Sequence, residues 1–312
     1  MTDLRYLSSE DGFLGLDSEN SPPPEEARAV IVPFGLEATV SYEGGTAKGP
    51  QAMLDASHEV ELFDEEFWFE PVHHYGVATL EPPKIEKPVE KALDQLAAIT
   101  GEILSQDRFP MVFGGEHSIT PGAIRPFLEQ VPDLVVLHFD AHADLRDGYN
   151  GEKFSHASAI RRILDDPSAE VVSVGIRNIS QSEIGFYEDN RDRIHIHWAK
   201  DKALWTLDKI IEPLRDRPIY LTFDLDGFDG SVMPATGTPE PGGLFWDDVM
   251  AIIRKAADVG DIIGADINEL APRPNLHGCD FLAAKLAYKI LSFAHLGMPE
   301  KRGARPSNQS LH

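Results

Sequence analysis

Residues 134–144 read Leu-Val-Val-Leu-His-Phe-Asp-Ala-His-Ala-Asp, an apolar run that ends in alternating acidic and imidazole side chains. Apolar residues occupy consecutive positions of the run, so both of its faces are mostly apolar. A strand of this kind is typical of a parallel sheet that helices cover on both sides. With similar runs elsewhere, it predicts strands at Ala29–Phe34, Tyr75–Leu80, Pro110–Phe113, Leu134–Asp140, Glu170–Gly175, Ile194–His197, Pro218–Asp224 and Asp261–Asp266.

Segments with the helical period fill the intervals between these strands. The predicted helices are Gly49–Leu62, Pro88–Gln106, Pro121–Gln130, His156–Leu164, Gln181–Asn190, Lys200–Leu214, Trp246–Val259 and Asp280–Leu291. No Pro/Ser/Gly-rich linker and no internal repeat interrupts this alternation. We therefore expect one three-layer α/β domain over residues 28–296. Residues 1–27 are expected to form an extended N-terminal arm, and residues 297–312 a flexible polar C-terminal tail.

The chain is strongly acidic, with 28 Lys and Arg against 52 Asp and Glu and a formal net charge of −24. Such a field repels phosphate backbones and anionic membranes, which makes nucleic acid and membrane surfaces poor partners, and it favours small cations and metal ions. The single Cys279 cannot form an internal disulfide, and no signal peptide or long apolar span is visible. We therefore expect a cytoplasmic protein.

Polar clusters follow three of the predicted strands, at the edge where parallel sheets bind ligands. They are Gly114-Gly115-Glu116-His117-Ser118, Asp140-Ala141-His142-Ala143-Asp144 and Asp224-Leu225-Asp226. Alternate residues of an extended segment share a face, so the side chains of each cluster are expected to converge.

Four aspartates gathered at one spot would repel one another, and the charge of two divalent ions would compensate that repulsion. Aspartates also cap turns, but the three clusters together favour a two-metal site. Oxygen and imidazole ligands without thiolate suit Mn²⁺, with Zn²⁺, Co²⁺, Ni²⁺ and Fe²⁺ as alternatives.

The clusters Gly114–Ser118, Phe139–Asp144 and Thr222–Asp226 resemble the three signatures of the ureohydrolases, the arginase/agmatinase superfamily. The resemblance extends from about Ile31 to about Phe293 and includes the loop Gly-Thr-Pro-Glu-Pro-Gly-Gly at 237–243. It implies an α/β/α fold with an eight-stranded parallel sheet, two Mn²⁺ ions per chain and hydrolysis of a guanidino group to urea. It also implies a homo-oligomer, usually a trimer or a hexamer.

Carried onto this chain, the family pattern implies which residues hold the metals. His117, Asp140, Asp144 and Asp224 would hold one ion, and Asp140, His142, Asp224 and Asp226 the other. His156 matches the family's second catalytic histidine, which contacts the substrate and exchanges a proton with the leaving amine. Glu269 matches the glutamate that grips the guanidinium through two parallel N–H bonds. With Asp144, these two make up the expected catalytic set, although His156 and Glu269 on their own would fit a helix start and a loop.

The substrate is less well specified than the chemistry. The loop 145–155 resembles that of microbial agmatinases. Asn178 and Ser180 stand where arginases have an aspartate pair that recognises the substrate's α-amino group, and only Glu183 is retained nearby. These features favour agmatine, a dication that an acidic mouth would attract. We expect Asp147, Glu152 and Glu183 to contribute to that mouth.

Four other readings stay open. Aminopropylagmatine fits a longer acidic cleft, and anionic-tailed substrates such as guanidinobutyrate or formiminoglutamate would use Arg146, Lys153 or Arg177. Arginine ranks last among the substrates. A non-catalytic metal-binding relative would also keep these motifs, because one fold can host unrelated functions. A two-metal phosphoesterase is disfavoured because the Asn-His pairing typical of such sites is not visible. Gly230 stands where the family usually has proline; this difference could loosen the loop without touching a ligand, and its effect stays open.

Overall fold

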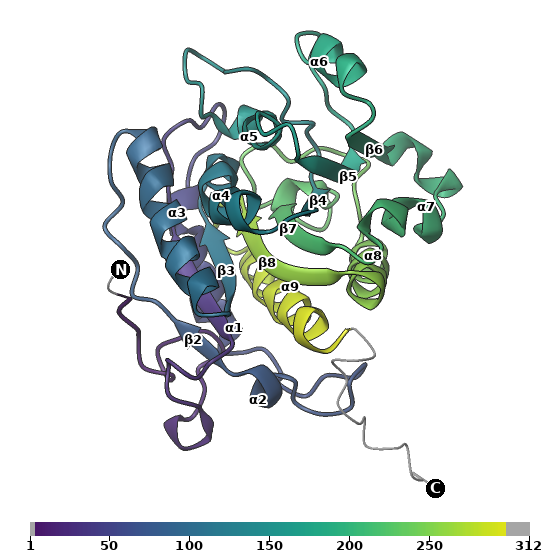
Figure 1. The fold of residues 1–312 in the computed structure, drawn as a ribbon. Coiled ribbons are helices and arrows are strands. Elements are labelled where there is room, and N and C mark those ends of the chain that lie inside the picture. Colours follow the sequence, from purple (N-terminus) through teal and green to yellow (C-terminus); the bar gives the residue numbers. More distant parts are fainter. Residues whose placement is uncertain (1–3, 298–312) are drawn as a thin grey trace, which may run out of the picture.

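The computed structural model of the chain describes residues 4–297. Within that range a single sheet of eight parallel strands forms the centre, in the order β2-β1-β3-β8-β7-β4-β5-β6 (Figure 1). The three-layer fold and the eight-stranded parallel sheet are thus confirmed. The strands are β1 Ala29–Phe34, β2 Val77–Thr79, β3 Phe109–Gly114, β4 Val135–Phe139, β5 Glu170–Ile176, β6 Ile194–Trp198, β7 Pro218–Asp224 and β8 Asp261–Asn268.

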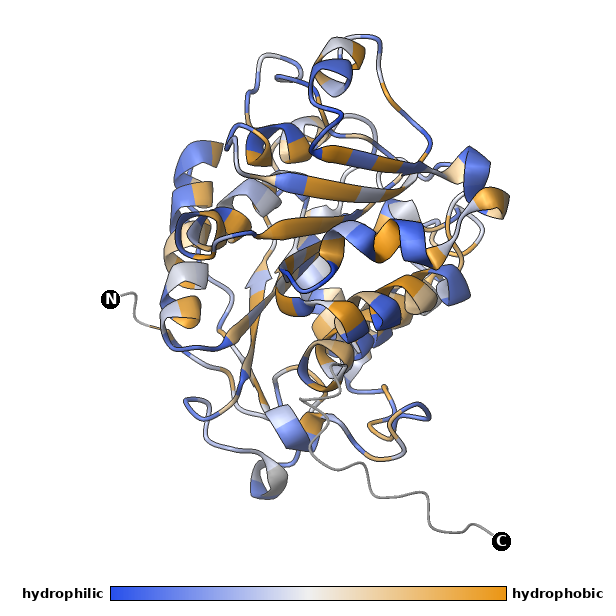
Figure 2. Ribbon diagram, turned by 45° about the vertical axis from the view of Figure 1, so that its right-hand side comes forward, coloured by the Kyte–Doolittle hydropathy of each residue, from blue (hydrophilic) through white to orange (hydrophobic). Residues whose placement is uncertain are grey.

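Helices cover both faces of the sheet, as the apolar strands require. They are α1 Gly49–Ser57, α2 Val72–Tyr75, α3 Val89–Ser105, α4 Thr120–Gln130, α5 Ala159–Ile163, α6 Ile184–Asp189, α7 Leu207–Ile211, α8 Trp246–Val259 and α9 His277–Leu296. One apolar core lies between the sheet and α1, α7, α8 and α9, and a second between the sheet and α3, α4 and α5. Successive residues of one strand alternate between the two: Val136 faces the second core, while Val135 and Leu137 face the first. Figure 2 shows hydrophobic residues concentrated in the strands and mixed with hydrophilic ones along the helices.

The predicted helix Lys200–Leu214 is wrong as a continuous element. The segment forms a 3₁₀ helix at Ala199–Leu204, then α7, then a second 3₁₀ turn at Glu212–Leu214. Trp205 and Thr206 between them are extended, with ψ of 145° and 134°. The Trp205 side chain packs on the apolar core and against the ring of His197. This tertiary contact overrides the local helical preference.

Other boundaries also shift. Tyr75 ends the short helix α2 instead of opening a strand, because the next residue, Gly76, has a positive φ of 63° that interrupts the helix. The predicted helix Gln181–Asn190 begins only at Ile184, where α6 starts, and the predicted helix from His156 begins with a 3₁₀ turn before α5. Helix α1 stops at Ser57, whose hydroxyl accepts a hydrogen bond from the backbone of Leu14.

Residues 4–27, the expected N-terminal arm, lie along the outer edge of β2. The backbone N–H of Leu7 donates to the carbonyl of Thr79 at 2.8 Å, and the side chains of Phe13, Leu14 and Leu16 are buried in the first core. Burial of these side chains removes apolar surface from water and covers an open sheet edge. From residue 298 onward, the expected C-terminal tail lies outside the described residues. Between residues 4 and 297, no helix is both long and apolar enough to cross a membrane.

Candidate metal centre and substrate cavity

The sheet order brings the three sequence clusters together. Strands β3, β8, β7 and β4 are neighbours, and their carboxyl ends meet at one edge of the sheet. His117 follows β3, Asp140 and His142 follow β4, Asp224 ends β7, and Glu269 follows β8. The Gly114-Gly115 pair permits this approach, because a Cβ atom on Gly114 would collide with the side chain of Asn268 and one on Gly115 with the carbonyl of Leu36.

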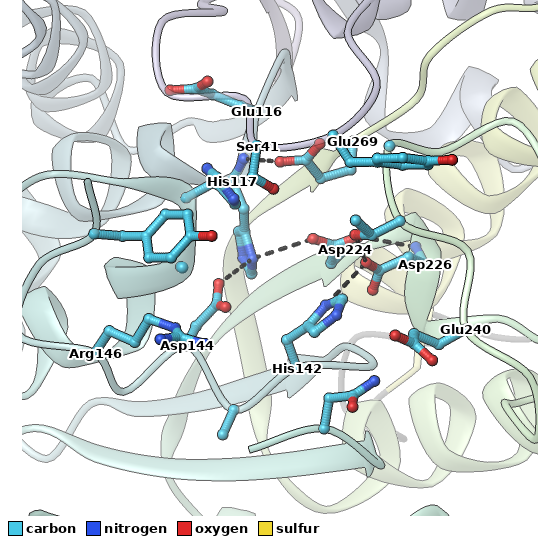
Figure 3. Close-up of a pocket in the computed structure, with 18 of the residues that line it drawn as sticks. Ser41, Glu116, His117, His142, Asp144, Arg146, Asp224, Asp226, Glu240 and Glu269 are labelled. Carbon is cyan, nitrogen blue, oxygen red and sulfur yellow. Dashed lines mark hydrogen bonds and ion pairs between the residues drawn. The ribbon is translucent and has the colours of Figure 1, made fainter. Parts of the chain in front are cut away.

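His117 lies at the centre of one group of carboxylates. Its Nδ1 is 3.2 Å from Oδ2 of Asp144 and 3.4 Å from Oδ2 of Asp224 (Figure 3). The same Nδ1 is 3.1 Å from Oδ2 of Asp140, and all four side chains are buried. This Nδ1 atom nonetheless makes no hydrogen bond within the described chain. The opposite nitrogen, Nε2, is 2.9 Å from the Thr222 hydroxyl, which fixes the ring so that Nδ1 faces the acids.

His142 lies in a second group that shares Asp140. Its Nδ1 is 3.0 Å from Oδ2 of Asp226 and 3.5 Å from Oδ1 of Asp140. Asp140 therefore directs one oxygen toward His117 and the other toward His142. A carboxylate placed in this way could offer one oxygen to a cation beside His117 and the other to a cation beside His142.

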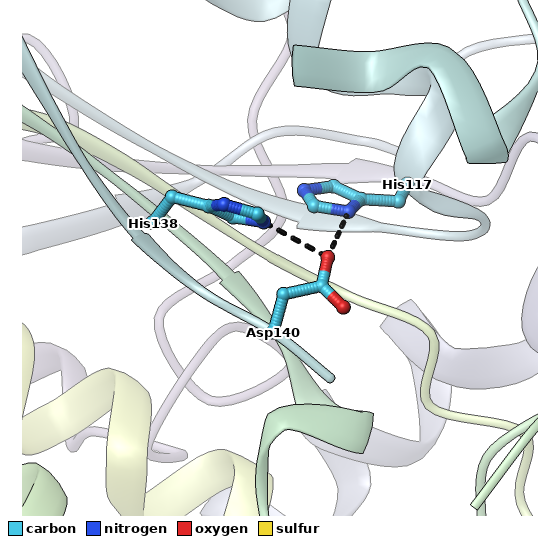
Figure 4. Close-up of side chains that lie close together, drawn as sticks. All are labelled: His117, His138 and Asp140. Atoms are coloured by element: carbon cyan, nitrogen blue, oxygen red, sulfur yellow. Dashed lines mark hydrogen bonds and ion pairs between the residues drawn. The ribbon is translucent and has the colours of Figure 1, made fainter. Parts of the chain in front are cut away.

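His138 is a member of this centre that sequence analysis missed. It lies inside β4, and its Nε2 is 2.9 Å from Oδ2 of Asp140 (Figure 4). Its Nδ1 is 3.0 Å from the hydroxyl of Ser173 on the neighbouring strand. His138, His117 and Asp140 offer ligand atoms within 4.8 Å of one another, as do Asp140, His142 and Asp226. His138 precedes Asp140 by two residues and therefore shares its face of the strand. This spacing could have identified His138 from the sequence.

The pKa values of the buried carboxyl groups indicate whether the site suits cations. Burial and the neighbouring Asp140 raise the pKa of Asp144 to about 7. Burial, together with Asp226 and Asp140, raises the pKa of Asp224 well above its usual value. In both residues the ionised form is therefore disfavoured when only protein surrounds it. Divalent cations among these oxygen and imidazole ligands would reverse that effect, so the residues fit the metal dependence expected of them.

Two residues of the candidate site have unusual backbone conformations. Asp144 has φ of 51° and Glu269 has φ of 68°, in the left-handed region that side chains other than glycine rarely adopt. Such conformations cost on the order of 1 kcal/mol or more and cluster at functional sites. Both of these residues were proposed as functional from the sequence.

Glu269 and His156, two of the three expected catalytic residues, line the cavity above the carboxylates. Oε1 of Glu269 accepts a hydrogen bond of 2.7 Å from the backbone N–H of His117, which leaves the other carboxylate oxygen free of that contact. Burial and the nearby Glu116 raise the pKa of Glu269 to about 8, because the bond from His117 only partly offsets them. Burial lowers the pKa of His156, so its imidazole is neutral near pH 7.

His156 is held in place by a chain of polar contacts that the sequence did not reveal. Its Nδ1 is 3.1 Å from the Thr39 hydroxyl, which donates to Oε1 of Glu116 at 2.9 Å. The other oxygen of Glu116 accepts from the backbone N–H groups of Ala38 and Thr39. Glu116, buried beside His117, thus anchors the segment that contacts the proposed proton carrier.

A cavity of about 300 Å³ opens above the centre and is lined by many acidic side chains. These are Glu43, Glu116, Asp144, Glu183, Asp224, Asp226, Glu240 and Glu269. Arg146 is the one lysine or arginine among the described lining residues, and its guanidinium lies over the ring of Tyr149, 4.9 Å from the ring centre.

Of the three acidic residues expected at the mouth of the cavity, one lines the cavity and two lie outside its lining. Glu183 lines the cavity, but it is buried and accepts hydrogen bonds from the backbone of Leu145 and Ser180. Asp147 is exposed, is not among the lining residues and pairs with Arg162 at 2.7 Å. Glu152 is likewise outside the lining and accepts a bond from the backbone of Phe154.

Hydrogen bonds to the Asp229 carboxylate hold the loop that follows the third signature and contains Gly230. One oxygen of Asp229 accepts from the Ser231 hydroxyl at 2.6 Å, and the other accepts from the backbone N–H groups of Gly242 and Gly243 at 2.7 and 3.0 Å. These hydrogen bonds from Ser231, Gly242 and Gly243 flank Gly230 and link the two ends of the loop through Asp229.

Comparison with known proteins decides the family. The sequence model of the arginase family matches residues 27–292. The chain belongs to the arginase family. It is 34% identical over 288 residues to the N(1)-aminopropylagmatine ureohydrolase of Synechocystis sp., with 89% of this chain and 92% of that protein covered. It is 31% identical to the agmatinase of Bacillus cereus, with 86% and 91% covered. The crystal structure of the agmatine ureohydrolase of Thermoplasma volcanium superposes with a TM-score of 0.78 at 30% identity, covering 91% of this chain and 94% of that one.

The expected superfamily and enzyme class are thereby confirmed. The protein is an agmatinase-like ureohydrolase, a hydrolase that acts on guanidino compounds. The Asp/His cluster at the carboxyl ends of the strands could hold metal ions, in keeping with the metal dependence of that family.

Proposed function

We propose that the chain hydrolyses agmatine to putrescine and urea, using two divalent ions, Mn²⁺ in the first instance. The single observation that carries this proposal is the acidic cavity above the Asp/His cluster, in which Arg146 is the only fixed cation among the described lining residues. A dication enters such a cavity favourably, and a substrate with an anionic tail would lose this attraction.

The proposed metal ligands are the six residues that converge at the strand ends: His117, Asp140, His142, Asp144, Asp224 and Asp226. Two divalent ions, when bound, generate a strong nucleophile from water at neutral pH. A guanidinium carbon needs that help, because its charge is delocalised over three nitrogens. The ligand aspartates bring negative charge that offsets the charge of the ions.

The remaining roles fall to groups that face the cavity. The oxygen of Glu269 that the His117 backbone leaves free can accept guanidinium N–H bonds and so orient the carbon toward the metal side. His156, neutral near pH 7, can accept a proton and pass it to the departing amine. Asp144, whose Oδ2 lies 3.2 Å from Nδ1 of His117, would take part as an ionised carboxylate that helps to hold the ions.

A second candidate substrate is N(1)-aminopropylagmatine. The favouring observation is that relatives bearing this name, from Synechocystis sp. and Thermus thermophilus, are 34% and 31% identical over about nine tenths of this chain. The longer polyamine tail carries one more positive charge, which the acidic cavity would also attract.

A urea-release assay of the Mn²⁺-loaded protein tests the proposal. Agmatine, N(1)-aminopropylagmatine, guanidinobutyrate and arginine are compared by kcat/KM. We expect agmatine to give the highest value. A higher value for aminopropylagmatine would replace the substrate and keep the chemistry, whereas urea release from none of the four compounds would refute the proposed function.

A further inference from the structure

Glu240 is an acidic side chain of the cavity that is neither a proposed metal ligand nor a proposed catalytic group. Glu240 belongs to the loop 237–243 and lines the cavity near His142 and Asp226 (Figure 3). Its backbone is fixed, because its carbonyl accepts a 2.8 Å bond from Arg177. The same guanidinium group donates to the carbonyl of Asp226 at 2.7 Å. Arg177 thereby links the loop to the metal-bearing segment and fixes where Glu240 sits.

The other acids of the lining that lie outside the proposed ligand set are already engaged. Glu43 pairs with Arg273 at 3.0 Å, and Glu116 accepts from the backbone and hydroxyl of Thr39. Glu183 accepts from two backbone N–H groups, and Glu269 accepts from the backbone of His117. The carboxylate of Glu240 has no hydrogen bond or ion pair with any residue in the described part of the chain, and it is only partly exposed.

The fixed charges of the cavity are arranged unevenly. Figure 3 shows Arg146 and Glu240 on opposite sides of the metal-ligand side chains. Arg146 is held by its contact with the Tyr149 ring, so its positive charge stays on that side. A substrate whose guanidinium is held at Glu269 and whose far end carries an ammonium group is repelled from Arg146 and attracted to Glu240.

We propose that Glu240 binds the distal ammonium group of the substrate and so sets the preference for guanidino compounds with a cationic tail. This inference rests on the proposed function. A partly desolvated carboxylate facing an ammonium group forms a charge-assisted hydrogen bond. Glu240 is therefore a specificity residue, and its contribution is confined to substrates that carry the amine.

Agmatine and 1-butylguanidine provide the matched substrates, because they differ only in the terminal amine. Glu240→Gln keeps the side-chain shape and the backbone bond to Arg177 but removes the charge. We expect the variant to lower kcat/KM for agmatine by about 10- to 100-fold, mainly through KM, as loss of a charge-assisted bond predicts. The rate with 1-butylguanidine is expected to stay at the wild-type value. Glu43→Gln, a lining carboxylate already paired with Arg273, is the control and is expected to leave the ratio of the two substrates unchanged.

The outcomes separate this inference from the proposed function. If the wild-type enzyme releases no urea from agmatine, the proposed function fails at the outset. If the wild type turns over agmatine and Glu240→Gln changes neither substrate, or slows both equally, Glu240 does not bind the amine and the inference is overturned. Selective loss with agmatine supports it.

Discussion

Removal of the metal ions should make the stability of this enzyme depend on pH in an unusual direction. Acidic proteins usually lose stability as the pH falls, because carboxylates that are stabilised in the fold become protonated. Asp144 behaves oppositely, since burial and Asp140 raise its pKa from 3.8 to about 7 when no cation is present. The folded metal-free chain then binds more protons than the unfolded chain between these two values, so its free energy of unfolding falls as the pH rises.

The size of this effect follows from the same pKa. A rise from 3.8 to about 7 corresponds to about 4 kcal/mol at about 1.4 kcal/mol per pKa unit. His117 and His142 act in the same direction above pH 6.5: burial lowers their pKa values, but the surrounding aspartates raise them by more. The metal-free protein should therefore lose several kcal/mol between pH 5 and pH 8. Bound cations keep Asp144 ionised at little cost, so the loaded protein should lose much less.

Thermal unfolding of metal-free and Mn²⁺-loaded protein at several pH values between 5 and 8 measures this difference. The stabilisation by metal is expected to grow steadily with pH. Asp144→Asn is the matched variant, because a neutral side chain of the same shape mimics the protonated acid. Its metal-free form should be more stable than the metal-free wild type at pH 8 and similar to it at pH 5. A metal-free wild type whose stability is constant or rises over this range would refute the argument.

Three further changes test other parts of the structure. Glu269→Gln should weaken agmatine binding by about 10- to 100-fold while the metal content measured by elemental analysis stays unchanged; unchanged binding would remove Glu269 from the guanidinium role. Thr39→Val should lower kcat and move the pH profile of kcat, because it removes the contact to His156, and Thr39→Ser should restore both; a profile that Thr39→Val leaves in place would argue against this positioning. Lys289→Met should destabilise the fold by about 3–5 kcal/mol, because it leaves the buried Asp64 without its 2.9 Å partner. Adding Asp64→Asn should recover much of that loss in denaturant unfolding, and a single variant as stable as the wild type would contradict the importance of the pair.

The sequence was sufficient to predict the sheet and the meeting of the proposed metal ligands at one of its edges, because both depend on local patterns. An apolar strand that ends in polar residues places those residues at the carboxyl edge whatever the neighbouring strands are. His117, Asp140 and Asp224 could therefore be assigned to one site before their strands were shown to be neighbours. The segment 200–214 could not be predicted in the same way, since the contact between Trp205 and the core depends on a distant part of the chain.

The contacts that support the site also could not be predicted from the sequence. Thr39 and Glu116 are far apart in the chain and meet only because β1 and β3 pair side by side. The role assigned to Glu240 depends on which other acids are already engaged, and Glu43 and Glu183 are engaged by residues that no local pattern links to them. Asp147 shows the reverse case. Its place within the Leu145–Ser155 loop suggested that it lines the mouth of the cavity, but it is exposed and paired with Arg162.

The central claim is that the Asp/His cluster binds the ions with which this enzyme hydrolyses a guanidino compound. Metal content and urea release from agmatine, measured on the same Mn²⁺-loaded preparations of wild type, Asp226→Asn and the surface control Asp94→Asn, test it most directly. We predict two ions per chain and urea release for the wild type and the control, and loss of both for Asp226→Asn. Full urea release from an Asp226→Asn protein depleted of metal would contradict the account.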